Sequence, residues 1–193
     1  MKNVLVVDCC IRRQGRTREL MESFIAALPE HCRVTRLRLE EENLSCLTGA
    51  FFEAREALLA QGRLDHPRFR YAHQFAQADE IVVAAPFWDL SFPALLKVYI
   101  EQVSVDGITF RSAHGGLQGL CKAQHLVYLT TRGGVYTGDP MEMGSRYMDA
   151  MHSFFGIKDY ICIAADAMDT SSYDGKALLR QAKEEAAALA GTF

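Results

Sequence analysis

The chain lacks any long apolar segment and any excess of positive charge. No apolar run reaches the about 20 residues that a helix needs to cross a bilayer, and Met1 leads directly into a short strand pattern instead of the apolar core of a signal peptide. The 24 Asp and Glu residues outnumber the 21 Lys and Arg residues, which gives a formal net charge of -3. Because affinity for nucleic acid and anionic membranes grows with clustered positive charge, we expect neither partner. We expect a cytoplasmic protein.

The six cysteines do not show the spacing of a metal site or of a disulfide scaffold. Cys9 and Cys10 are adjacent, the others are scattered, and no CxxC pair accompanies a histidine cluster. Neighbouring cysteines form strained disulfides, so we expect reduced thiols and no metal. A redox-active Cys9-Cys10 pair remains an alternative.

Glycine-rich nucleotide motifs and linkers are also absent. The chain has neither GxGxxG nor GxxxxGK[ST], which weighs against NAD bound in the Rossmann manner and against nucleotide hydrolysis. No Gly/Ser/Pro-rich or repeated segment marks a boundary, and 193 residues with 49% hydrophobic content suit one domain. We expect a single domain over residues 1–193, with an insertion at about 40–65.

What the chain does contain is an alternation of short apolar runs and helical patterns. We expect strands at 3–7, 33–38, 80–84, 124–130 and 160–164. We expect helices at 17–28, 67–78, 92–103, 143–155 and 172–189, and helical spacing over 51–60 inside the insertion. This alternation predicts an α/β fold with a doubly wound, five-stranded parallel sheet in the flavodoxin-like strand order 2-1-3-4-5. The long excursion at 40–65 favours a lid or a subunit contact.

In that strand order the first, third and fourth strand exits lie side by side, where ligands of such sheets bind. The first exit carries Cys10, Arg12, Gly15, Arg16 and Thr17 and leads into a helix. A phosphate there would meet backbone N–H groups and the positive end of the helix dipole, and the arginines and the threonine hydroxyl would add donors. The alternative is that the threonine only caps the helix and that the arginines are solvated.

The second exit places two large aromatic side chains where loops are normally polar. Its residues are Pro86, Phe87, Trp88, Asp89 and Leu90. The aromatic pair favours a site for a flat ring, although the pair could instead pack in the core or at an interface.

The third exit contains paired glycines. Its residues are Thr131, Arg132, Gly133, Gly134 and Tyr136. Glycines let the backbone approach a ligand closely and present N–H groups to a carbonyl edge. A plain turn would explain the glycines equally well.

Nearly the whole chain resembles the flavodoxin-like FMN-dependent NAD(P)H oxidoreductases, especially the azoreductase and quinone reductase group. The resemblance is strongest at 4–7, 84–88, 96–99, 107–111 and 131–134. It implies that the motif at 87–90 wraps the isoalloxazine ring and that the motif at 131–134 binds its polar edge. It also implies that Cys10 and the segment 15–17 hold the FMN phosphate.

The resemblance further implies a reaction. NADH or NADPH would reduce FMN by hydride transfer, and two electrons would then pass to a quinone, an azo compound or a related small-molecule acceptor, with ping-pong kinetics. No protein nucleophile or acid–base pair is needed, and Tyr136 could modulate the flavin edge. A homodimer is implied, with its contact sought at 40–65 and Phe110. The alternative is a one-electron carrier or a flavin-binding regulatory module.

This chain departs from the typical pattern of these enzymes at three places. Its first loop carries cysteines and arginines where azoreductases have a serine-rich loop. Asp89 stands where Asn is frequent, and Tyr136 stands where His is common. We expect these changes to affect acceptor range and redox potential more than flavin binding.

Overall fold

A computed structural model describes residues 1–113 and 115–193 of the chain. A parallel sheet forms its centre, built from β1 (Lys2–Asp8), β2 (Cys32–Arg38), β3 (Glu80–Ala84), β6 (His125–Thr131) and β7 (Asp159–Ala165). The strand order is β2-β1-β3-β6-β7, and all neighbours are parallel. Counted along the chain, this is the predicted order 2-1-3-4-5. The fold class is therefore confirmed, and each strand lies within one residue of its predicted bounds.

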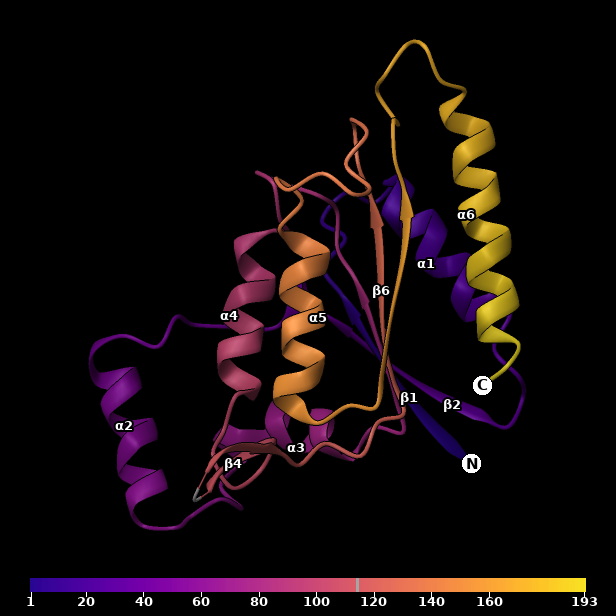
Figure 1. Ribbon diagram of the computed structural model, residues 1–193. Helices are drawn as coiled ribbons and strands as arrows, with labels where there is room; N and C mark the ends of the chain where they lie inside the picture. Colours follow the sequence, from indigo (N-terminus) through magenta and orange to yellow (C-terminus); the bar gives the residue numbers. More distant parts are fainter. Residues whose placement is uncertain (114) are drawn as a thin grey trace.

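Helices cover both faces of the sheet (Figure 1). On one face lie α1 (Arg16–Ala26) and α6 (Gly175–Ala190), and on the other lie α3 (Arg70–Gln77), α4 (Ala94–Val103) and α5 (Gly144–Phe155). Successive side chains of a strand point to opposite faces, so Val4 and Val6 of β1 join the core under α1 and α6, while Leu5 and Val7 join the other.

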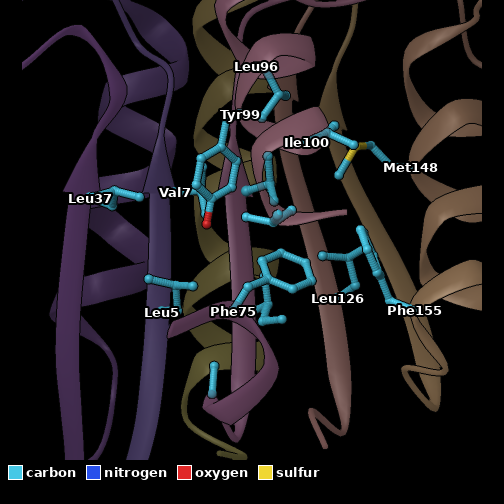
Figure 2. Close-up of a cluster of buried hydrophobic side chains, with 14 of the residues drawn as sticks. Leu5, Val7, Leu37, Phe75, Leu96, Tyr99, Ile100, Leu126, Met148 and Phe155 are labelled. Carbon is cyan, nitrogen blue, oxygen red and sulfur yellow. The ribbon is translucent and has the colours of Figure 1, made fainter. Parts of the chain in front are cut away.

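The core beneath α3, α4 and α5 is dominated by large side chains (Figure 2). Tyr99 of α4 packs edge-on against Phe75 of α3, and Phe75 packs against Phe155 of α5 with ring centroids 4.8 Å apart. Leu126 of β6 is fully buried in the same cluster. Burying a Leu or Phe side chain contributes roughly 1.5–3 kcal/mol, so these contacts fix the helices against the strands whose carboxyl ends carry the loops.

The segment between β2 and β3 contains η1 (Leu39–Glu41), α2 (Gly49–Ala60) and η2 (Pro67–Phe69). The predicted helix at 67–78 is thus divided into η2 and α3. α2 has no buried residue and stands apart from the sheet (Figure 1). It is held by Leu58 and Leu59, which pack with Leu64 against a small cluster around Phe69 and Val105.

The chain also forms an antiparallel hairpin, β4 (Phe110–Ala113) and β5 (Gly116–Gly119), which the sequence analysis missed. Its short strands contain glycines and show no alternation of apolar and polar residues. The hairpin packs tightly on the end of α5: a Cβ atom on Gly119 would lie 2.0 Å from the backbone nitrogen of Gly156. Within residues 1–113 and 115–193, no helix combines the length and apolarity needed to cross a membrane.

Candidate functional site

A cleft of about 410 Å³ lies at the carboxyl ends of β1, β3 and β6 and reaches the segment that follows β7. The three loops singled out from the sequence all contribute to its wall. The lining residues are Cys10, Ile11, Arg12, Gln14, Gly15, Arg16, Thr17, Arg18, Pro86, Phe87, Trp88, Thr131, Arg132, Gly133, Met168 and Asp169. The predicted site residues Asp89, Leu90, Gly134 and Tyr136 lie outside this lining.

The first loop leads from β1 to the N-terminus of α1, whose N-cap is Gly15 and lacks a side-chain capping bond. Thr17 therefore does not cap the helix, so that part of the alternative is wrong, whereas Arg12 and Arg16 are exposed as the alternative expected. The Thr17 side chain is buried, and its hydroxyl lies 2.7 Å from the hydroxyl of Thr131. This hydrogen bond joins the first loop to the third. The uncapped N–H groups and the helix dipole leave an anion-binding end facing the cleft.

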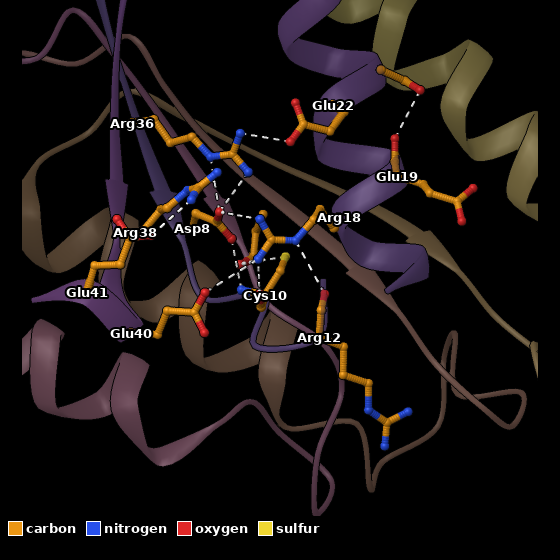
Figure 3. A network of polar contacts seen from close by, with 12 residues as sticks. Asp8, Cys10, Arg12, Arg18, Glu19, Glu22, Arg36, Arg38, Glu40 and Glu41 are labelled. Atoms are coloured by element: carbon orange, nitrogen blue, oxygen red, sulfur yellow. Dashed lines mark hydrogen bonds and ion pairs between the residues drawn. The ribbon is translucent and has the colours of Figure 1, made fainter. Parts of the chain in front are cut away.

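Beneath this loop lies a network of polar contacts centred on Asp8 (Figure 3). The Asp8 carboxylate is 2% exposed and accepts hydrogen bonds from the Cys10 N–H at 2.9 Å and from Arg36 Nη2 at 2.8 Å. Arg18 Nη1 lies 3.4 Å from the same carboxylate. A buried carboxylate requires such partners. The sequence analysis missed Arg18 and Arg36, because only the spatial pairing with Asp8 distinguishes them from the chain's other arginines.

The two adjacent cysteines are free thiols buried under the same loop. Burial, reinforced by the nearby Asp8 charge, raises the pKa of Cys9 to about 12 and raises the pKa of Cys10 as well. The thiolate is the reactive form of cysteine, so both side chains stay protonated and unreactive near neutral pH. They act as small buried side chains beneath the loop.

The second loop makes a tight turn at the rim of the cleft. Trp88 and Ser91 exchange two backbone hydrogen bonds, and the central residues Asp89 and Leu90 have φ values of 49° and 66°. Positive φ at both central positions is the geometry of a type I′ turn. The Trp88 side chain remains 40% exposed, so it is not part of the core. Phe87 packs against Tyr136, with ring centroids 4.6 Å apart.

The third loop pairs through its carbonyl groups with the segment after β7. The carbonyl of Gly133 accepts the N–H of Asp169 at 2.9 Å, and the carbonyl of Gly134 accepts the N–H of Ala167 at 2.8 Å. The N–H groups of Gly133 and Gly134 donate to no protein acceptor in the part of the chain that the structure describes. Two backbone donors are therefore available beside the cleft, as a ring with a carbonyl edge requires.

The buried side chain of Arg132 anchors the third loop through ion pairs. It is 3% exposed and forms ion pairs with Asp166 at 3.1 Å and Glu142 at 3.3 Å. Burial disfavours the charged form of Asp166, but the N–H donors of Thr137 and Tyr136 outweigh it and hold the pKa of this carboxyl below its usual value. Arg132 is therefore neutralised by its partners, and it lines the cleft as part of a fixed wall.

Residues 2–190 match the family described as having a flavodoxin-like fold. The chain belongs to this family. It is 37% identical over 201 residues to FMN-dependent NADH:quinone oxidoreductase 2 of Clostridium acetobutylicum, with 100% of each chain covered. It is 37% identical over 203 residues to the protein of the same name from Clostridium perfringens, again with 100% of each covered. The azoreductase of Bacillus anthracis superposes with a TM-score of 0.89 at 28% identity and full coverage of both chains. The resemblance to FMN-dependent oxidoreductases is thus confirmed.

The acidic residue that lines the cleft is not the one expected from the sequence. Asp89 is exposed and lies outside the lining, whereas Asp169 lines the cleft from the segment after β7. Met168 and Asp169 were not predicted, because the prediction rested on three strand exits and both residues follow the last strand. The acidic residues that directly follow the last strand were the available signal.

The helical part of the insertion lies away from the cleft, although Glu40 at its start is 3.8 Å from the cleft-lining Arg18. None of residues 40–65 lines the cleft, and α2 stands at the opposite end of the molecule from the first loop (Figure 1). The insertion therefore does not cover the chain's own cleft in this structure, and its role as a lid or a subunit contact stays a prediction. Phe110, the other position expected at a subunit contact, begins β4 and packs against Phe154, with ring centroids 4.7 Å apart.

Proposed function

We propose that the protein is an FMN-dependent oxidoreductase that uses NADH or NADPH to reduce a quinone, an azo compound or a related small acceptor by two electrons. One observation carries this proposal: an anion-binding helix N-terminus, an exposed indole and the acceptor-free amide of Gly133 converge on a single cleft, with the acceptor-free amide of Gly134 beside it. These are the groups that a phosphate, a flat ring and the polar edge of that ring would need. Relatives that match over their full lengths are named as FMN-dependent NADH:quinone oxidoreductases, which supports the same function.

The phosphate end of FMN would lie in the first loop. Cys10, Arg12, Gly15, Arg16 and Thr17 line the cleft there. The backbone N–H groups at the start of α1 would donate to the phosphate oxygens, and the guanidinium groups would balance their charge. Hydrogen bonds that involve a charged group contribute roughly 1.5–3 kcal/mol each, so a few of them suffice to anchor the cofactor.

The ring end would lie between the second and third loops. The segment 86–90 would flank the ring with Phe87 and Trp88, and the segment 131–134 would bind its polar edge, with Tyr136 beside it. Bound FMN supplies the redox chemistry, accepting a hydride from the nicotinamide and delivering two electrons to the acceptor. The amides of Gly133 and Gly134 belong to the peptide groups whose carbonyls, on Arg132 and Gly133, accept hydrogen bonds from the segment after β7, and the amides so fixed would stabilise negative charge at that edge. No side chain needs to act as a nucleophile.

An absorbance spectrum and an anaerobic reduction test this function. The purified protein, loaded with FMN, should be yellow, and NADH or NADPH should bleach it rapidly without oxygen. A quinone should then restore the colour, and steady-state kinetics should give parallel double-reciprocal lines. A protein that retains no FMN, or that holds FMN but does not respond to either nicotinamide, would contradict the proposal. The second result would indicate an electron carrier instead.

The proposal includes a cytoplasmic homodimer. The six free cysteines suit a reducing compartment. On α2, Phe52 is 43% exposed, and Phe51, Leu58 and Leu59 are partly exposed, which leaves an apolar surface on the insertion. Light scattering on a gel-filtration column should give twice the mass of the 193-residue chain, and Phe52→Glu should lower it. A monomer at micromolar concentration would contradict the dimer.

A further inference from the structure

We propose that Arg18 is a positioning residue that shapes the first loop into an anion site, and that it acts through its hydrogen bonds to loop carbonyls rather than through its charge. This inference rests on the proposed FMN function and adds a role for a residue in the first turn of α1. Arg18 lines the cleft, yet its side chain is only 13% exposed. It turns back under the loop instead of extending into solvent (Figure 3).

Its contacts are with the backbone of the loop. One guanidinium nitrogen donates to the carbonyl of Cys10, and Nε donates to the carbonyl of Arg12 at 3.3 Å. A carbonyl oxygen that faced the cleft would repel a phosphate, so binding two of them removes two unfavourable groups. In contrast, the side chain of Arg12 extends away from the network (Figure 3).

These two hydrogen bonds also fix the directions of the N–H groups that share a peptide group with the two carbonyls. A trans peptide places its N–H opposite to its C=O, and the described chain contains no cis peptide bond. Holding the carbonyls of Cys10 and Arg12 therefore turns the N–H groups of Ile11 and Arg13 away from Arg18. Neither of these N–H groups donates to a protein acceptor within the described ranges. Ile11 lines the cleft and Arg13 does not, so the N–H of Ile11 is the one available to an anion there.

The charge of Arg18 is already balanced. Its guanidinium lies 3.4 Å from Asp8 and 3.8 Å from Glu40. The other arginine on Asp8, Arg36, is paired in addition with Glu22 at 2.7 Å. Three carboxylates thus face two guanidinium groups, and the network has no surplus of positive charge to offer a phosphate. Arg18 instead supplies a planar guanidinium whose several N–H donors fix the loop. A lysine ammonium cannot reproduce this arrangement of donors.

The test compares FMN with riboflavin, which has the same ring and ribityl chain but no phosphate. Apoprotein is titrated with each flavin, with fluorescence quenching as the signal, for the wild type, Arg18→Met and Arg18→Lys. The control is Arg38→Met, because Arg38 is half-exposed and pairs only with Glu41 within the described residues. We expect both Arg18 variants to lose at least about tenfold in FMN affinity, with riboflavin affinity unchanged within about threefold. The control should keep the wild-type preference for FMN.

Each other outcome overturns the inference. If Arg18→Lys keeps the full preference for FMN, charge alone is what the site requires. If an Arg18 variant loses FMN and riboflavin to the same degree, the role is general structure. If Arg18→Met fails to fold, Arg18→Lys still tests the inference. It keeps a cation beside Asp8 and so preserves the charge balance, but it lacks the guanidinium donors. A wild type that binds no FMN would instead reject the proposed function, a result that is visible before any variant is made.

Discussion

Arg16 and Asp169 form an ion pair across the cleft, with Arg16 Nη1 2.8 Å from Asp169 Oδ1. The pair links the start of α1 with the segment after β7, and both residues line the cleft. The Arg16 side chain is 45% exposed and that of Asp169 is 68% exposed, so the ion pair is weak and Arg16 can exchange Asp169 for another anion. A phosphate at the start of α1 would compete with Asp169 for the guanidinium.

Removing this competitor should strengthen FMN binding. We expect Asp169→Asn to lower the FMN dissociation constant by about two- to fivefold, because an exposed ion pair is worth up to about 1 kcal/mol. Riboflavin affinity should not change. Glu41→Gln, which breaks the exposed pair with Arg38, is the matched control and should leave both constants unaltered. A weaker FMN affinity in Asp169→Asn would show that the carboxylate supports the site instead of competing with the phosphate.

The sheet was predictable because its central strands are covered on both faces. Such strands are continuous runs of Val, Ile, Leu and Ala, as at β3, and no other element of this length produces that signal here. The hairpin of β4 and β5 gave no signal, because its strands are four residues long, β5 contains two glycines, and the hairpin packs on α5.

The cleft was predictable only as far as topology defines it. The strand order places three exits together, so the sequence alone predicts that the loops at 10–17, 86–90 and 131–134 meet. The partners of Asp8 could not be predicted. Arg18 and Arg36 lie on different elements, and no periodicity in the sequence distinguishes them from the other arginines. Asp169 reaches the cleft from the edge strand of the sheet, so finding it would have required the exit of the last strand to be considered as well.

Gly119 should tolerate no side chain. A Cβ atom there would lie 2.0 Å from the backbone nitrogen of Gly156, and backbone cannot move as a flexible side chain can. We expect Gly119→Ala to lower the free energy of unfolding by about 3 kcal/mol, at the upper end of overpacking costs. Gly191→Ala is the control: its added carbon would lie 3.6 Å from its nearest neighbour, so stability should not fall. Urea unfolding measures both, and an unchanged Gly119→Ala would mean that the hairpin does not pack on α5.

The turn at 88–91 stores strain at Leu90, whose φ of 66° is unfavourable for a residue with a branched side chain. Asparagine accepts this conformation more readily than leucine. We expect Leu90→Asn to raise the free energy of unfolding by about 1 kcal/mol. Met141→Asn, a similar change at an exposed position without positive φ, should give no such gain. A loss of stability in Leu90→Asn would show that the apolar contacts of Leu90 outweigh the strain.

Asp166 should make stability depend on acid pH. The pKa of this carboxyl is held below its usual value in the folded protein, so the ionised form stabilises the fold above the unfolded pKa of about 3.9. That contribution is fully present at pH 7 and is lost as the pH falls through the folded pKa. We expect Asp166→Asn to lower the free energy of unfolding at pH 7 by about 2 kcal/mol, since it removes charged hydrogen bonds to Arg132 and two N–H groups.

The difference between wild type and Asp166→Asn should then shrink between pH 5 and pH 3, when urea unfolding is repeated across that range. Glu53→Gln is the control, because Glu53 is exposed and forms no ion pair among the described residues. It should match the wild type at every pH. A difference for Asp166→Asn that stays constant down to pH 3 would show that hydrogen-bond geometry, and not the charge of the carboxylate, holds the third loop against Arg132.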